Sequence, residues 1–344
     1  MALRERKARV GAIPEGGMAD IAFLLLVFFL VTTTIDMDKG LGIILPAEGQ
    51  ELEINKKNIL NCLISASGNV LLGGEPVEMK DLSRRVKEEI RANDKLIISV
   101  KAHAISNIVD SLKNIIGEKT SIISAVNGLP WWYFYKANTG TNLDNHHIDS
   151  VDPEGKIWKH LDPAKAIGCV VYPAAEITEP GVIKHNGGER FTLGEPDGSK
   201  SERLKLIADL LIAGGLKAPQ KSNLRDEIWI KLWGNCSFNI ISALYDKTLD
   251  EIGNDPELLK IVRKLMEECQ QVGEKIGVKF NVSIDHRINA AISIKGHKPS
   301  TTQDLHAKRP LEIDPIIGSL IEIGNKVNIK TENLKSEYEK LKTK

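Results

Sequence analysis

The sequence predicts a chain that joins an α/β part to an all-α part, with a membrane helix near its N-terminus. An apolar run, 18–35, follows a basic N-terminus. Near the middle, two short runs typical of buried strands flank an amphipathic helix pattern at 105–116. From about Arg225 onward the pattern is helical throughout. These three observations divide the chain into an anchor, a partial parallel sheet and a helical domain.

The length of 344 residues leaves room for two or three domains. Lysine plus arginine and aspartate plus glutamate number 46 each, so the net charge is zero and there is no electrostatic signature of nucleic-acid binding. The four cysteines form no C-x-x-C pair, which argues against a zinc ribbon or a redox dithiol and favours reduced packing residues. They are Cys62, Cys169, Cys236 and Cys269. We therefore expect neither a metal site nor a nucleic-acid partner.

The apolar run predicts a single-pass membrane helix over 18–35, just long enough to span a bilayer. Basic residues precede it and aspartates follow it, so the positive-inside rule places residues 1–17 in the cytoplasm. A signal peptide and a buried helix are the alternative interpretations, although no small-x-small cleavage site follows. Asp20 lies at the head of this helix, where it is either a proton or ion site or an N-cap at the membrane interface.

The following segment, 36–94, has the pattern of a small α+β unit. Two strand-like runs surround Gly68-Asn69, which is a hairpin signal. Residues 79–93 then have the spacing of a helix with one apolar face.

The stretch from about 12 to 95 resembles the ExbD/TolR biopolymer-transport proteins, above all in IPEGGMADIAFLLLVFFLVTTTIDMDKGLGIILP. The resemblance implies that 36–94 is part of a periplasmic domain. It also implies that Asp20, with Pro14 before it, is the proton-coupling residue, and that the partner is a membrane protein of the ExbB/TolQ type. We call residues 1–94 the transporter-like segment.

A short strand is predicted within RANDKLIISVKAHAIS, at about 96–100, and a second one at about 120–126. The amphipathic helix between them completes a parallel-sheet unit. Lys101 and Asn127 lie at the ends of these strands, on the sheet edge where such folds bind ligands. The alternative for each is a cap or a solvent contact. The aromatic residues 131–135 are expected to form a packed loop.

The helical region includes RDEIWIKLWGNCSFNIISALYD, in which Lys231, Asn235 and Asn239 are spaced four residues apart. This spacing places the three polar side chains on one helix face among apolar neighbours. A lysine buried in such a place has a lowered pKa and can donate a proton near neutral pH. The alternative interpretation is an amphipathic helix with a narrow polar side.

A later polar stretch, HKPSTTQDLHAKRPLEID, contains Ser300 and Glu312 and leads into an apolar helix, where Glu312 could also be a helix-dipole partner. With VKAH, NGLPWW and KLWGNCSFN before it, this stretch resembles the 2-dehydropantoate 2-reductase (ketopantoate reductase) family over about 94–329. The resemblance implies reduction of 2-dehydropantoate to pantoate with NADPH, in the route to pantothenate and coenzyme A. The implied site residues are Lys231 and Glu312 for catalysis, Asn235, Asn239 and Ser300 for substrate binding, and Lys101 and Asn127 for cofactor binding.

One element of that family is missing from the sequence. The reductases begin with a strand and a G-x-G-x-x-G loop whose backbone N–H groups hold the cofactor pyrophosphate. No such pattern occurs, and the transporter-like segment stands in its place. We therefore expect 95–220 to be a partial Rossmann-like domain, 221–330 a helical domain and 331–344 a polar tail.

The two resemblances imply different compartments. A membrane helix with a cytoplasmic N-terminus places everything after it outside the cytoplasm, where NADPH is not available. We predict a ketopantoate-reductase-like oxidoreductase, impaired by loss of its phosphate loop, that acts on a small 2-keto acid and forms a homodimer. It would be membrane-bound through 18–35 if the anchor inserts and cytoplasmic otherwise. The alternatives are a membrane-anchored ExbD/TolR-type proton-coupled transport accessory protein and an inert fusion or assembly chimera.

Overall fold

The computed structural model describes most of the chain from the middle onward and only short stretches before it. The described residues are 59–64, 70–72, 75–78, 81, 84–85, 88, 97–99, 105–106, 109–110, 112–113, 116–118, 120–179 and 182–344. The predicted membrane helix 18–35, Asp20 and Lys101 lie outside them. Within these ranges, every helix is too short or too polar to cross a membrane.

The first sheet joins the transporter-like segment to the strand that follows it. Its order is β3-β2-β1-β4, built from β1 (Ile59–Ile64), β2 (Val70–Leu72), β3 (Glu75–Val77) and β4 (Ile97–Ser99). The strands β1 and β2 are antiparallel, with Ile64 opposite Val70, as the hairpin signal predicts. The strands β1 and β4 are parallel, with Ile59 opposite Ile97. The strand β4, which a phosphate loop would precede in a reductase, therefore does have a hydrogen-bonded neighbour. That neighbour is β1 of the transporter-like segment.

A second sheet, of order β5-β6-β9, carries the predicted ligand-binding edge. Its strands are β5 (Ile122–Ser124), β6 (Ala166–Val171) and β9 (Phe191–Gly194). The strand β5 is parallel to β6, whereas β9 is antiparallel to β6. Among the described residues, β5 thus pairs with β6 and not with β4. The two predicted strands, which correspond to β4 and β5, are therefore not hydrogen-bonded to each other. Helix α5 (Glu202–Ala213) packs on β9, and helix α4 (Lys156–His160) precedes β6 in the chain. The strands β7 (Ala174–Glu179) and β8 (Val182–Gly187) pair with each other in a hairpin.

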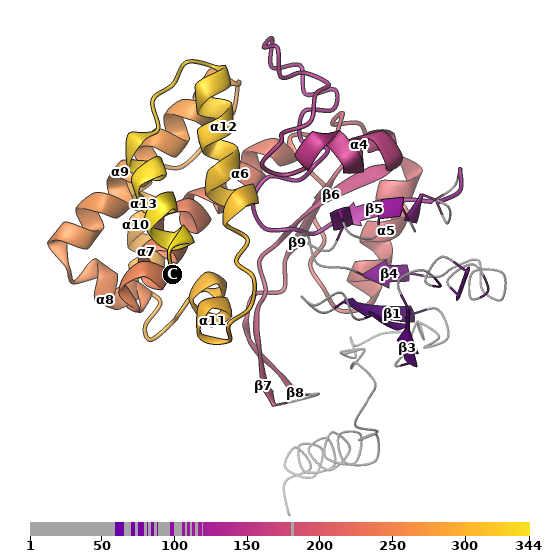
Figure 1. Ribbon diagram of the computed structural model, residues 1–344, viewed down its shortest axis with the longest axis horizontal. Coiled ribbons are helices and arrows are strands. Elements are labelled where there is room, and N and C mark those ends of the chain that lie inside the picture. Colours follow the sequence, from indigo (N-terminus) through magenta and orange to yellow (C-terminus); the bar gives the residue numbers. More distant parts are fainter. Residues whose placement is uncertain are drawn as a thin grey trace, which may run out of the picture.

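The chain from 224 onward forms a separate helical body beside the sheets (Figure 1). It contains α6 (Leu224–Gly234), η4 (Asn235–Asn239), α7 (Ile240–Tyr245), α8 (Leu249–Gly253), α9 (Pro256–Lys275), α10 (Ile284–Ile292), α11 (Ser300–His306), η5 (Asp314–Gly318), α12 (Ser319–Lys326) and α13 (Glu332–Lys342). The central helix α9 begins at an Asp-Pro pair, a common helix-start signal: the Asp255 side chain accepts the Leu258 N–H, and Pro256 is the first residue of the helix. It packs against α6, η4, α12 and α13.

The C-terminal residues belong to this helical body. The segment 331–344, expected to be a polar tail, instead forms helix α13. Leu334 and Leu341 are 0% and 2% exposed and pack in the main core, on α7 and α9. Two apolar residues seven positions apart cover one side of a short helix, which is enough when neighbouring helices complete the contact.

An aromatic loop joins the sheets to the helices. Trp131 to Phe134 are all buried in the main core, as the packed-loop interpretation predicts. Trp229 of α6 donates its indole N–H to the Tyr133 hydroxyl at 2.6 Å. Arg225 donates to the backbone carbonyls of Tyr133 and Tyr135, both at 2.9 Å. These bonds fix the start of α6 against the end of the second sheet.

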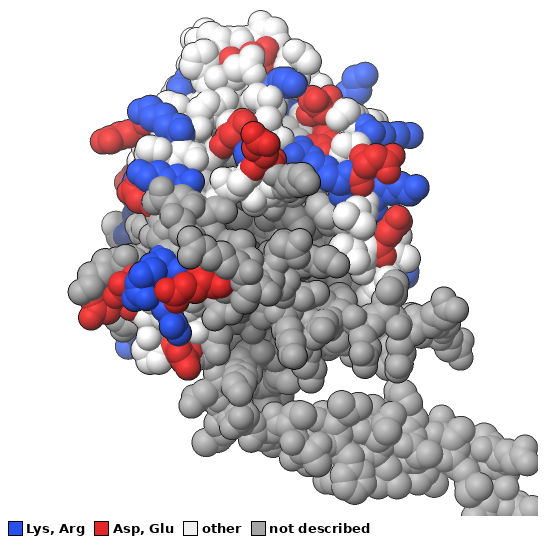
Figure 2. Space-filling view, turned by 90° about the vertical axis from the view of Figure 1, so that its right-hand side faces the viewer, with Lys and Arg blue, Asp and Glu red and all other residues white. Residues whose placement is uncertain are grey.

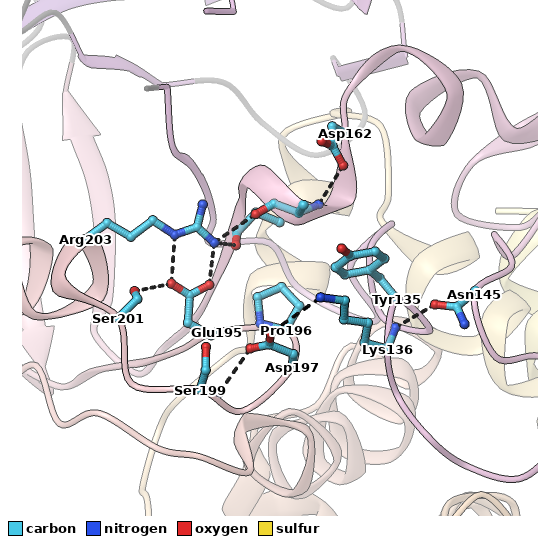
Figure 3. A network of polar contacts seen from close by, with 12 residues as sticks. Tyr135, Lys136, Asn145, Asp162, Glu195, Pro196, Asp197, Ser199, Ser201 and Arg203 are labelled. Carbon is cyan, nitrogen blue, oxygen red and sulfur yellow. Dashed lines mark hydrogen bonds and ion pairs between the residues drawn. The ribbon is translucent and has the colours of Figure 1, made fainter. Parts of the chain in front are cut away.

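A partly buried ion pair joins α5 to that sheet (Figure 3). Glu195, 4% exposed, accepts from Arg203 Nε at 2.8 Å and from Arg203 Nη2 at 2.5 Å, and also from the Ser201 hydroxyl. Arg203 Nη2 donates in addition to the Ala164 carbonyl at 2.9 Å. The Glu195 carboxylate is enclosed, whereas the Arg203 side chain is 35% exposed, so removing Arg203 would leave the buried carboxylate uncompensated.

The charges on the outer face of the sheet part are mixed. Figure 2 shows lysine and arginine interspersed with aspartate and glutamate among the described residues of that face. This distribution agrees with the net charge of zero and offers no single-sign surface for a polyanion.

Candidate active site

The polar stripe lies on one continuous helix that contains a π-helical turn. Helix α6 passes into the π-helical segment η4 and then into α7. In a regular α-helix four residues advance about 400°, so side chains spaced by four drift by about 40° at each step. A π turn contains more residues and opposes this drift. Consistent with this, Asn239 Nδ2 donates to Asn235 Oδ1 at 3.2 Å, which aligns the two amides.

Lys231 lies one turn before these amides and points at the end of β5. Its Nζ donates to Asn127 Oδ1 at 2.9 Å. Burial lowers the pKa of the Lys231 ammonium to about 8, and nearby Cys169 and Glu312 oppose part of this shift. Burial raises the pKa of the Cys169 thiol to about 11, so the thiol is neutral while Lys231 titrates. The Glu312 carboxylate is therefore the counter-charge that matters.

Asn127 links the lysine to this carboxylate. Its Nδ2 donates to Glu312 Oε2 at 3.0 Å, while its Oδ1 accepts from Lys231. Each end of the amide thus has a partner of matching polarity, which fixes the orientation of the side chain. The result is a chain of charge-assisted hydrogen bonds that crosses from the second sheet to the helical body.

The loop that presents Asn127 is docked by the residue after it. Gly128 has a φ of +77°, and a Cβ there would lie 2.3 Å from the Pro315 carbonyl oxygen. The next N–H, of Leu129, donates to that same oxygen at 2.8 Å. Pro315 lies in η5, shortly after Glu312. Only glycine allows this approach, which places Asn127 next to the segment that carries Glu312.

Of the predicted site residues, the structure brings five together: Lys231, Asn127, Glu312, Asn235 and Asn239. Asn235 is 9% exposed. Ser300 is exposed as the first residue of α11 and has no hydrogen bond to the other predicted site residues among those described. Among the residues that the structure describes, no group of three or more histidine, cysteine or acidic side chains could hold a metal ion. Cys169, Cys236 and Cys269 are free and buried.

Sequence reasoning missed the residues that hold this site in place. Gly128 and Pro315 form the contact between the strand end and the Glu312 loop. Arg225 anchors α6 to the aromatic loop. The Asn-Gly pair was a local signal for a tight backbone at Gly128, whereas Arg225 had no signal because it binds backbone carbonyls far away in the sequence.

Two family models match different parts of the chain. Residues 223–344 match the model described as "Ketopantoate reductase PanE/ApbA C terminal", and residues 5–118 match "Biopolymer transport protein ExbD/TolR". The first match reaches the C-terminus, beyond the expected end of the helical domain. The second extends past residue 95, through β4 and the helix pattern that follows it.

Comparison with whole proteins covers most of the chain. A 2-dehydropantoate 2-reductase from Mesorhizobium japonicum is 41% identical over 266 residues, which are 77% of this chain and 81% of the relative. A match of that length begins before residue 94, so it overlaps the match to the transporter family. The crystal structure of a candidate ketopantoate reductase from Ralstonia solanacearum is 33% identical, with a TM-score of 0.67 over 72% of this chain and 75% of that one.

A more distant structure shares the fold. It is a D-mandelate dehydrogenase in a ternary complex with NADH and anilino(oxo)acetate, 22% identical, with a TM-score of 0.60 over 72% of this chain and 74% of that one. Fold, site geometry and whole-chain similarity thus agree for the larger part of the sequence. The chain belongs to the 2-dehydropantoate 2-reductase (ketopantoate reductase) family, and it carries at its N-terminus a segment that matches the ExbD/TolR family, as in a chimera.

Proposed function

We propose that the reductase part converts 2-dehydropantoate to pantoate, with Lys231 as the general acid. The observation that carries this proposal is the enclosed Lys231, with its pKa lowered to about 8 and its Nζ held by the Asn127–Glu312 hydrogen-bond chain. A lysine with this pKa is a stronger acid than a free one, yet it stays mostly protonated at neutral pH. One of its remaining N–H groups can point at the ketone oxygen and transfer a proton as the alcohol forms.

The other residues would bind and orient the substrate. Asn235 and Asn239 lie on the same helix as Lys231 and present amides suited to the hydroxyl and carboxylate of the keto acid. Ser300 would add a hydroxyl from α11. Glu312 would hold Asn127, and thereby Lys231, in one geometry and balance its charge.

NADPH would supply the hydride when bound. At the nicotinamide end, Asn127 and the carboxyl ends of β5 and β6 fit the place where this fold binds a dinucleotide. At the pyrophosphate end, the chain has no G-x-G-x-x-G sequence to supply the backbone N–H groups. We therefore propose weak cofactor binding and slow turnover, in a homodimer built through the helical body.

The test is product formation by the purified full-length chain. We expect pantoate, detected by mass spectrometry, at millimolar NADPH with 2-dehydropantoate, with NADPH far from saturating. NADH at the same concentration tests the cofactor choice. Absence of pantoate after prolonged incubation, with the fold confirmed by circular dichroism, would contradict the proposal and favour the inert fusion.

Replacing Gly128 by alanine is expected to lower kcat/KM for this reaction about tenfold, because the Cβ would push Asn127 away from Lys231. The matched control is Gly140→Ala. Gly140 has a similar φ of +72°, but nothing lies within 4 Å of its Cβ position. Both variants carry the left-handed penalty of about 1–2 kcal/mol in urea unfolding. Equal activity of the two variants would show that the Gly128 contact does not position the site.

The match of 5–118 to the ExbD/TolR model supports a second candidate, a membrane-anchored proton-coupled transport accessory protein that works with an ExbB/TolQ-type partner. In that case 18–35 spans the membrane with residues 1–17 in the cytoplasm, and Asp20 carries the proton. The discriminating variant is Asp20→Asn in a reconstituted proton-coupled uptake system. Unchanged uptake would exclude this function.

A further inference from the structure

A small cavity lies beside Lys231, at the carboxyl ends of β5 and β6. Its volume is about 20 Å³, and its lining includes Ser124, Trp132, Cys169, Lys231 and Asn235. A cavity of this size has room for one water molecule, provided that two or more polar atoms face it.

Two buried polar atoms belong to residues of this lining. Ser124 Oγ and Trp132 Nε1 have no hydrogen-bond partner among the described residues, and their side chains are 5% and 1% exposed. An unsatisfied buried hydroxyl or N–H costs about 1–3 kcal/mol, so such atoms normally bind protein groups or ordered water. Lys231 has three N–H groups, and one of them donates to Asn127.

The backbone holds these groups in place. Ser124 is the last residue of β5 and pairs with Gly168 of β6. A Cβ at Gly168 would lie 2.5 Å from the Trp132 ring, so the absence of a side chain at Gly168 leaves room for the indole beside β6. Ser124 and Trp132 are thus held beside β6, and both residues line the same cavity as Lys231.

We propose that this cavity binds a single water molecule, and that Ser124 is a positioning residue because it holds this water against the Lys231 ammonium. The inference rests on the proposed function, in which Lys231 is the general acid. Trp132 Nε1 and Lys231 Nζ donate to the water oxygen, and the water donates to Ser124 Oγ. A water that accepts from the ammonium stabilises the charged form, so the pKa of Lys231 is higher than it would be in a dry cavity.

The test is the pKa of Lys231 in the full-length chain without substrate or cofactor. It is measured from the pH dependence of Lys231 acetylation by acetic anhydride, followed by mass spectrometry of the peptide. Ser124→Val replaces the hydroxyl by methyl groups that fill the cavity. We expect the pKa to fall by about one unit, which raises the unprotonated fraction of Lys231 at pH 6 about tenfold.

The matched control is Thr192→Val. Thr192 Oγ1 on β9 is another buried hydroxyl with no partner among the described residues, and Thr192 does not line the cavity. Its removal is expected to leave the pKa of Lys231 unchanged.

Because valine could overpack the site, Ser124→Ala is the second variant. In a cavity with water it removes one of the water's partners and lowers the pKa of Lys231. In a dry cavity the Ser124→Ala substitution removes only a hydroxyl that has no hydrogen-bond partner, so the pKa of Lys231 does not change. An unchanged pKa in Ser124→Ala overturns the proposal. The result does not depend on turnover, so loss of the proposed reductase function would leave this test intact.

Discussion

Replacing Lys231 by methionine is expected to lower kcat/KM for keto-acid reduction about a thousandfold, the scale of a lost general acid. Methionine has nearly the shape of lysine without the amine, so the helix and its packing stay intact. The free energy of unfolding should not fall, because the variant removes a charge that is costly to bury. The measurement is steady-state kinetics with 2-dehydropantoate at one fixed millimolar NADPH concentration for both proteins, together with urea unfolding.

The pH profile distinguishes acid catalysis from simple positioning. The general acid must be protonated, and burial lowers the pKa of Lys231 to about 8. Wild-type kcat/KM should therefore be flat below about pH 8 and fall tenfold per pH unit above it, whereas a lysine with an ordinary pKa near 10.4 would stay active through pH 9. Lys231→Arg keeps the charge but cannot release a proton in this range. Wild-type rates in the arginine variant would rule out Lys231 as the acid.

The helix that carries Lys231 was predictable because its pattern is local. Positions four apart share a helix face whatever the rest of the chain does, so the stripe of Lys231, Asn235 and Asn239 follows from spacing alone. The start of α9 was predictable for the same reason, since Asp255 caps within its own first turn. The π-helical turn at η4 has no such local signal, and only the structure shows how it aligns the two amides.

Contacts between distant segments were not predictable from pattern. The bond between Asn127 and Glu312 joins residues 185 positions apart. Glu312 therefore entered the candidate site through family resemblance and not through spacing. The same holds for the first sheet, where β1 pairs with β4 across the predicted boundary of the transporter-like segment. Residues 331–344 were misassigned as a tail because burial of Leu334 and Leu341 depends on α7 and α9.

The matches to the two families overlap in sequence near β4, at the boundary of the transporter-like segment. The transporter-family match extends to residue 118, and the reductase match begins before residue 94. In the structure β1, from the transporter-like segment, is the parallel neighbour of β4. A short hydrophobic strand can serve either sheet, since main-chain pairing does not depend on family. The pairing with β1 provides hydrogen-bond partners for β4, but β1 is not followed by a G-x-G-x-x-G sequence.

Restoring that loop is the second large expected effect. Residues 1–94 would be replaced by the corresponding N-terminal part of the Mesorhizobium japonicum relative, which is 41% identical to this chain. Two or three charge-assisted hydrogen bonds from backbone N–H groups to the pyrophosphate contribute about 3–5 kcal/mol. The KM for NADPH should therefore fall by about two to three and a half orders of magnitude, with a similar rise in kcat/KM.

The hybrid with Lys231→Met separates the two contributions. This variant should bind NADPH as tightly as the hybrid does, measured by quenching of tryptophan fluorescence. Its rate of pantoate formation should be at most about a thousandth of the hybrid's rate. The hybrid also tests the sheet, because its new first strand must pair with Ile97–Ser99 in place of β1. A hybrid that folds with unchanged KM for NADPH would show that the missing loop does not limit this protein. Any slow turnover of the hybrid would then have to originate in the helical body that carries Lys231 and Glu312.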